Sequence, residues 1–406
     1  MSEVTHLLRR LTFGPTTGEV QAAEKAGRDA TLDRLLRPVA VPEPPDLGDD
    51  PVARLGKDAT RDQRQAARRS QREQVSAVVQ WWLGRMAAGG AAEKLTFFWH
   101  GHWATSVQKV RSAHLMLAQQ QTFRRYGAGG TGPLVRAMLR DPALILWLDG
   151  QKNTRKAPNE NLAREVMELF TLGVGAYTED DVKAGARVLT GWQVDRATGR
   201  ARLVAKRHDD RPVTLLGREG VLDLDGYADL LVRHEAHLPF IARRLWARYG
   251  GPSEAPAVTG PDTTAMLRAL CRTPEFGGTA GTLVKQPIEW LLGAVRQLGL
   301  PPSGSELILK ALGQVPLRPP SVGGWPAGAA WLTTSSTLTR LRAGQKLAGR
   351  ATAAADRLTG SDRIEALAAL LAVDGWSDRT HAALKGIKDP RRLLATGLAS
   401  PEYAVH

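Results

Sequence analysis

Two histidines and two glutamates are the residues of this sequence best suited to chemistry. His100 and His102 lie one residue apart in FFWHGHW (97–103), and Glu165 and Glu168 follow in NENLAREVMELF (159–170). Imidazoles and carboxylates together are what a metal centre or a general acid–base site needs. A site is therefore conceivable if the two segments meet in the fold, although the pattern names no reaction.

Residues 159–172 are predicted to form one helix whose polar side carries Asn161, Arg164, Glu165 and Glu168. We expect the two glutamates, neighbours at i,i+3 spacing, to be metal ligands or acid–base groups. Asn161 and Arg164 would then hold a substrate or orient a carboxylate. The alternative is an ordinary solvated face, because Arg164 has a glutamate four residues away on each side, as in surface ion-pair ladders.

The spacing of His100 and His102 limits what they can do together. Residues i and i+2 of a helix point about 200° apart, so both rings face one ion only on a strand or at a frayed helix end near Gly101. With Glu165 and Glu168 they would make a divalent-metal site suited to iron, manganese or zinc. The alternative is structural: each imidazole satisfies a buried carbonyl.

The composition sets broad limits. The chain has 406 residues, a net charge of +14 and a single cysteine, which allows no internal disulfide. The N-terminal residues contain no apolar run of signal-peptide length, and no stretch approaches 18 apolar residues, so we expect a cytoplasmic protein without a membrane span. The basic residues are spread along the chain rather than gathered in one stripe, so nucleic acid is not the expected partner.

Helical periodicity dominates the sequence and predicts an all-α, multi-helical fold. Helices are expected over 17–27, 59–88 and 283–300, among others. Alternating residues around a Gly-containing turn predict a small β-hairpin at 192–205, and 213–217 is expected to add a third short strand. The fold class is therefore all-α with a small β-hairpin insertion near 192–217.

A Pro- and Gly-rich segment at 315–332 is predicted to be a long ordered loop. Loops of this length usually cover a site or a domain junction. The alternative is a surface loop pinned by Trp325 and Trp331.

The sequence resembles the bacterial family called domain of unknown function 1800. The resemblance runs in order along nearly the whole chain, through HLLRRLTFGPT (6–16), FWHGHWATS (98–106), RDPALILWLDG (140–150), NENLAREVMELFTLGVGAYTEDDV (159–182), ARVLTGW (186–192), FIARRLWARY (240–249), RTPEF (272–276), RPPSVGGWPAGAAWL (318–332) and LASPEY (398–403). It implies one family-length, mostly helical unit over 1–406. A subdivision into a site-bearing region (1–260) and a C-terminal helical region (261–406) is the alternative.

The resemblance also bears on function. It favours roles for His100, His102, Glu165 and Glu168, because they lie in its most recognisable motifs, and it favours the approach of 318–332 to them. Members of the family are expected to be encoded beside a sulfatase-like partner family. The resemblance therefore implies a sulfatase-like partner protein here. It implies no activity.

Two main functions are open on this basis. The first is a metal-dependent enzyme, hydrolytic or oxidative, that uses the His/Glu site. The second is a non-catalytic binding or assembly protein that presents a Trp-rich helical surface to a partner. The chain has 11 Trp against 7 Phe and 5 Tyr, and Trp99, Trp103, Trp325 and Trp331 would be the contact residues.

Overall fold

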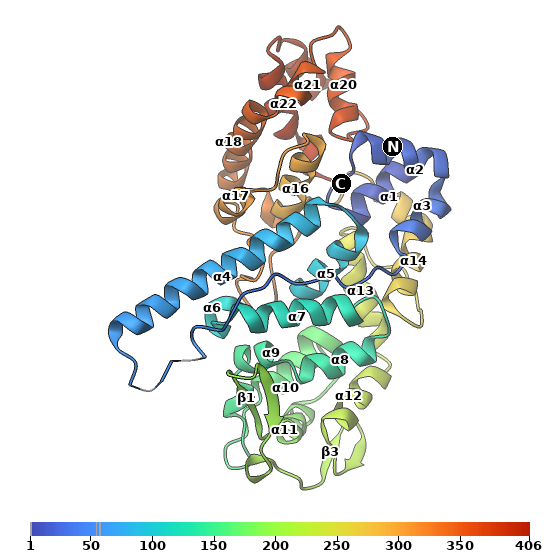
Figure 1. Cartoon of the computed structure of the whole chain (residues 1–406). Helices are drawn as coiled ribbons and strands as arrows, with labels where there is room; N and C mark the ends of the chain where they lie inside the picture. The colour runs from blue at the N-terminus through green and yellow to red at the C-terminus, as the bar shows by residue number, and fades with distance from the viewer. Residues whose placement is uncertain (1, 54, 57) are drawn as a thin grey trace.

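The computed structural model describes residues 2–53, 55–56 and 58–406 and shows a mostly α-helical protein, as the sequence predicts. Figure 1 shows α18 and α20–α22 at one end of the molecule and the hairpins with α11 and α12 at the other. Within the described residues, no helix has the combination of length and apolarity needed to cross a bilayer.

The named elements of the first half of the chain are all helices or helical turns. Its helices are α1 (Glu3–Leu11), α2 (Thr17–Ala26), α3 (Arg28–Leu35), α4 (Arg61–Ala87), α5 (Ala91–His102), α6 (Val107–Val110), α7 (Ala113–Tyr126), α8 (Thr131–Leu139), α9 (Pro142–Trp147), the 3₁₀ turn η1 (Gly150–Lys152), α10 (Asn161–Glu165), the π-helical turn η2 (Val166–Thr171) and α11 (Glu179–Val188).

The second half begins with the strands. These are β1 (Trp192–Asp195) and β2 (Arg200–Leu203), then β3 (Val213–Leu215) and β4 (Arg218–Gly220), with the 3₁₀ turn η3 (Ala205–Arg207) between the pairs. The remaining elements are α12 (Leu224–Arg233), α13 (His237–Tyr249), α14 (Thr263–Arg272), α15 (Pro274–Gly277), α16 (Pro287–Gln297), α17 (Ser305–Ala311), η4 (Gly328–Trp331), α18 (Thr334–Arg350), α19 (Thr352–Asp356), α20 (Arg363–Leu370), α21 (Asp378–Lys385), α22 (Pro390–Leu398) and α23 (Pro401–Ala404).

Local capping explains where several predicted helices begin. The side chain of Thr16 caps α2, that of Thr60 caps α4 and that of Thr178 caps α11, each in a reciprocal box with the residue three positions later. The helix predicted at 283–300 is shorter than expected. It begins at Pro287, because Lys285 and its neighbour are extended beside the C-terminal residues.

The β-structure differs from the prediction in one respect. The hairpin at 192–205 is confirmed, with β1 and β2 antiparallel. The segment 213–217 does not add a third strand to it, because β3 pairs with β4 in a second hairpin. Leu216 and Gly217 both have positive φ, 47° and 76°, as a tight two-residue hairpin turn requires.

Helix α5 lies between two large apolar clusters. Phe97 packs into the cluster formed with α4, α7, α16 and the C-terminal helices, whereas Phe98 and Trp99 pack into the cluster formed with α8–α14. A helix buried on all sides is expected to be apolar all round, and the run of aromatic residues at 97–99 satisfies this. The chemistry-bearing histidines are therefore on a helix that is buried on both sides.

One buried carboxylate joins α5 to its neighbours. Oε1 of Glu289 in α16 lies 2.7 Å from Nζ of Lys94 in α5 and 2.8 Å from Nη1 of Arg248 in α13, and 3.1 Å from Nε2 of His406. Lys94 Nζ also donates to the Thr12 carbonyl, at 2.9 Å. Although burial alone would raise the pKa of Glu289, the charges of Arg248 and Lys94 hold it well below its usual range. The carboxylate is therefore ionised and ties four parts of the chain together.

Replacing Glu289 by Ala is expected to lower the free energy of unfolding by about 3–5 kcal/mol, because Arg248 and Lys94 would lose their buried partner. Urea denaturation at pH 7 measures this. The matched control is Glu73→Ala, which removes an exposed i,i+4 pair with Arg69 and is expected to have little effect. Equal changes for the two variants would contradict the structural role of Glu289.

Candidate functional site

Two adjoining cavities, of about 120 and 210 Å³, share His102, Arg244 and Gly323 in their walls. We call them together the His102–Arg244 cleft. Its walls come from four of the motifs that carry the family resemblance: the end of α5, the π-helical turn and the residues after it, α13, and the loop 318–332. The other lining residues are Phe97, Phe98, Gly101, Glu168, Leu169, Gly173, Val174, Phe240, Ala247, Arg248, Gln286, Val322, Trp325 and Ala327.

Helix α13 presents one stripe to the cleft. Phe240, Arg244, Ala247 and Arg248 follow i, i+4, i+7, i+8 spacing, so they share a side of the helix. Ile241, Leu245 and Tyr249, which each follow one of these residues, pack into the apolar cluster instead. The amphipathic pattern of α13 therefore places two guanidinium groups in the cleft wall.

The loop 318–332 forms the other wall, and a glycine allows its close approach to α5. Gly324 has φ +84°, and a Cβ atom there would lie only 2.4 Å from the Gly101 carbonyl oxygen. The indole of Trp325 stacks on Phe97 at 5.2 Å between ring centroids. The expectation that 318–332 approaches the histidine motif is thus confirmed.

The polar helix predicted at 159–172 contains a π-helical turn, η2, in its second half. The amide of Leu172 donates to the Met167 carbonyl and the hydroxyl of Thr171 to the Val166 carbonyl, both five residues back. The wider turn shifts Glu168 relative to the preceding α-helical residues, and such turns are frequent at functional sites. Glu168 consequently lines the same cavity as His102.

His102 connects three elements through a neutral ring. Its Nε2–H donates to the Phe170 carbonyl at 2.9 Å, and its Nδ1 accepts from Nε of Arg244 at 3.4 Å. Burial, followed by the charge of Arg244, lowers the pKa of His102 from 6.5 to about 3. The ring therefore stays neutral and fixes Arg244 relative to the π-helical turn.

His100 performs a similar role on the other side of α5. Its Nε2 accepts from the amide of Leu317 at 3.0 Å, and the side-chain amide of Gln120 lies 3.1 Å from Nδ1. Leu317 has φ +66°, a strained conformation for a leucine, and its carbonyl accepts from Val107. His100 thus anchors the start of the loop that walls the cleft.

The structure brings together only part of the predicted His/Glu site. His102 and Glu168 line one cavity, whereas the His100 ring packs against Trp82 and Trp325 and faces away from it. Both histidines fall within α5, so their side chains diverge as i and i+2 residues of a helix must. Among the described residues there is no group of three or more His, Cys, Asp or Glu placed to hold a metal ion. Ligation by His100, His102, Glu165 and Glu168 stays a prediction.

Glu165 and Glu168 are close enough to influence one another. Burial and then the charge of Glu168 raise the pKa of Glu165. The hydroxyl of Tyr177 donates to Oε2 of Glu168 at 3.0 Å. Burial and this hydrogen bond raise the pKa of Tyr177 to about 12, so it stays a donor.

Asn161 and Arg164 have structural partners. The side-chain amide of Asn161 donates to the Leu148 carbonyl at 3.1 Å. Arg164 pairs with Glu160 at 3.0 Å and with Glu179 at 2.6 Å, on the outside of the molecule. Neither residue lines the cleft. The Glu160–Arg164 half of the expected surface ladder is present, whereas Glu179 takes the place expected for Glu168.

The predicted Trp-rich contact surface is wrong for three of its four members. Trp99 and Trp103 are each 1% exposed and Trp331 is 6% exposed. For Trp99 and Trp103 the cause is that α5, which lies between the two apolar clusters, carries them into one of these clusters. Trp325 is partly exposed but packs on Phe97 and His100.

Arg244 and Arg248 were not predicted as site residues. In FIARRLWARY they look like ordinary charges of an amphipathic helix. The signal that points to them is their spacing from Phe240 on one side of α13, together with the presence of this segment among the family motifs.

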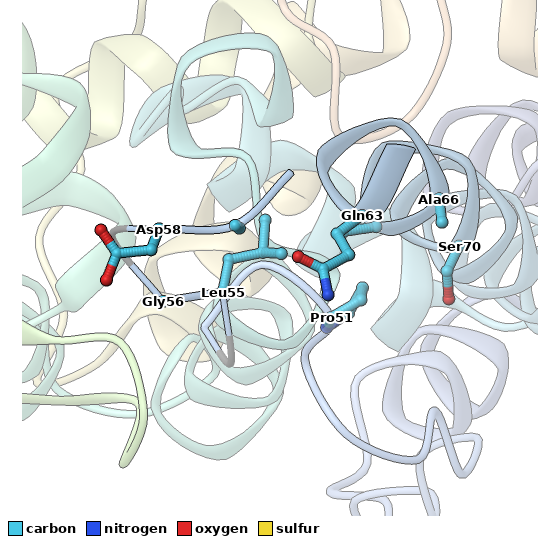
Figure 2. A pocket seen from close by; sticks show the side chains of 9 residues that line it. Pro51, Leu55, Gly56, Asp58, Gln63, Ala66 and Ser70 are labelled. Atoms are coloured by element: carbon cyan, nitrogen blue, oxygen red, sulfur yellow. The ribbon is translucent and has the colours of Figure 1, made fainter. Parts of the chain in front are cut away.

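A further hollow, of about 590 Å³, lies beside the start of α4 (Figure 2). Among its described lining residues, Asp58 is the one ionisable side chain, and Figure 2 shows it directed away from Gln63. This hollow pairs no acid with a base, so we do not assign it a role.

The family assignment follows from a comparison over the whole chain. The sequence model of the family described as "Protein of unknown function (DUF1800)" matches residues 6–405. The chain belongs to the DUF1800 family. No curated protein and no solved structure matches it. The four motifs that line the His102–Arg244 cleft are therefore family segments, although the family's description assigns no activity to them.

Protonation of the two buried histidines is predicted to couple to unfolding. Burial lowers the pKa of His100 and of His102 from 6.5 to about 3. Between these values the unfolded chain binds more protons than the folded one, so stability falls as the pH decreases from about 6.5 toward 3. At pH 5, each ring should therefore bind about one proton when the protein unfolds. The slope of the unfolding free energy against pH measures this proton uptake.

Two variants test this coupling. His100→Gln is expected to be less stable at pH 7 and to reduce the proton uptake by about one. The exposed His381→Gln serves as the control for the substitution and should leave the stability at pH 7 unchanged. A His100→Gln slope identical to that of the unmodified protein would show that the ring titrates normally.

Proposed function

We propose that this protein binds a small anionic molecule, such as a carboxylate or a phosphate ester, in the His102–Arg244 cleft. The observation that carries the proposal is that Arg244, which has no carboxylate partner among the described residues, lines both cavities, and that Arg248 and Trp325 beside it each carry an N–H group without an acceptor. Donors of this kind, two of them on guanidinium groups, are the usual means of binding carboxylate and phosphate oxygens.

Arg244 is the first of these donors. Its Nε donates to neutral His102, and among the described residues it has no ion pair with a carboxylate. It lines both cavities and is exposed to solvent. The guanidinium is therefore held in place from one side while its terminal nitrogens are free to meet a ligand.

Arg248 and Trp325 supply the other donors. Nη2 of Arg248 and Nε1 of Trp325 are buried and have no hydrogen-bond partner among the described residues, and both residues line the 120 Å³ cavity. Buried donors without partners are costly and rare. A bound anion would supply their acceptors.

Glu168 adds selectivity, because it lines the same 210 Å³ cavity as Arg244. A carboxylate in the same cavity as a guanidinium favours ligands that carry both an anionic group and a hydrogen-bond donor. The two volumes suit a metabolite-sized molecule rather than a polymer. The neutral imidazole of His102 acts as a positioning group and not as a base.

The test compares anion binding by the unmodified protein and by the Arg244→Gln variant. Binding is measured by calorimetric titration with inorganic phosphate, sulfate and succinate. At least one of these is expected to bind the unmodified protein, and the variant should bind it about tenfold or more weakly, since hydrogen bonds to charged groups contribute about 1.5–3 kcal/mol. Arg243→Gln, the neighbouring exposed arginine outside the cleft, is the matched control. Equal affinities in the two variants would overturn the proposal.

A metal-dependent enzyme is the second candidate. It is supported by the interaction of Glu165 with Glu168 and by the position of Glu168 beside His102. Elemental analysis after loading with iron, manganese or zinc is expected to give a fixed ratio of metal to protein. Glu168→Gln should abolish metal binding, whereas the exposed Glu179→Gln should preserve it. Metal content that is variable, or equal in both variants, would contradict it. A sulfatase-like partner rests on the family resemblance alone.

A further inference from the structure

A second cavity, of about 480 Å³, lies at the other end of α5 from the His102–Arg244 cleft. It is bounded by α1, α5, α7, α14 and the segment 34–42. The walls contain well-buried apolar side chains. These are Leu8 (2% exposed), Leu36 (8%), Leu95 (8%), Phe123 (1%) and Leu267 (1%). Its size falls within the range of small-molecule pockets.

The segment 36–42 runs as an extended strap over this cavity, and Figure 1 shows the dark-blue chain after α3 crossing α5 and α7. The side-chain amide of Gln121 in α7 holds it by donating to the Pro42 carbonyl at 2.9 Å. Two of its apolar side chains are exposed, Val39 at 64% and Val41 at 40%. Valines held at the mouth of an apolar cavity are placed to cover an apolar ligand.

The charges at the rim are unbalanced. The carboxylates in the cavity wall are paired, Glu93 with Arg124 at 2.8 Å and Glu19 with Arg296 at 2.6 Å. Three other lining arginines have no ion pair with any carboxylate that the structure describes: Arg34, Arg37 and Arg125. The cavity thus combines an apolar interior with an uncompensated positive rim.

We propose that this cavity binds a single-chain amphiphile with an anionic head, of the fatty-acid class. The hydrocarbon tail occupies the space between Leu95, Phe123 and Leu267, and the strap covers it. The carboxylate lies at the rim, where Arg37 and Arg125 supply the opposite charge. This site is distinct from the His102–Arg244 cleft and does not depend on its function.

Calorimetric titration with dodecanoate below its micellar concentration tests the proposal. Saturable one-to-one binding is expected, with affinity falling roughly fourfold for each methylene removed in decanoate and octanoate. Dodecyltrimethylammonium, which has the same tail and the opposite charge, should bind at least tenfold more weakly. No saturable binding of dodecanoate, or equal affinity for the cationic amphiphile, would overturn the proposal.

Variants of exposed residues locate the site without threatening the fold. Val41→Glu on the strap and the pair Arg37→Glu with Arg125→Glu are each expected to lower dodecanoate affinity at least tenfold. Leu341→Glu and Arg379→Glu, exposed positions on α18 and α21, are the matched controls and should bind like the unmodified protein. Equal affinity of the strap and control variants would place the amphiphile elsewhere and refute this assignment.

Discussion

The placement of α5 depends on one buried carboxylate. Glu289 binds Lys94 of α5 and Arg248 of α13 at once. Rotation or sliding of either helix would leave charges buried and unpaired, which costs several kcal/mol. The end of α5 therefore faces α13 in a fixed way, and His102 is held opposite Arg244. The cleft is a consequence of this ion cluster as much as of its own lining residues.

The two histidines act as connectors on opposite sides of α5. His100 holds Leu317 and with it the loop 318–332, and His102 holds Phe170 and Arg244. Both are neutral because burial opposes their charged forms. By contrast, the terminal nitrogens of Arg244 and Arg248 are left partly without acceptors.

Much of the fold follows from local sequence rules, and much of the site does not. Capping threonines and Gly27 set the ends of predicted helices, because those interactions involve near neighbours. The π-helical turn was not predictable, because it depends on contacts that the sequence pattern does not show. The Thr171 hydroxyl donates to the Val166 carbonyl, and Gly173 has no Cβ atom that would collide with the Phe240 ring. The backbone partners of His102 and His100, Phe170 and Leu317, lie 68 and 217 residues away. No spacing rule reaches that far.

The protonation state of His102 distinguishes a connector from a metal ligand or a base. Nitrogen-15 NMR of histidine-labelled protein measures it directly, with and without added zinc. A neutral ring protonated on Nε2 is expected from pH 8 down to about pH 4.5, unchanged by zinc, since its pKa is lowered to about 3. Titration near pH 6.5, or a zinc-dependent shift of either ring nitrogen, would contradict the role assigned to His102.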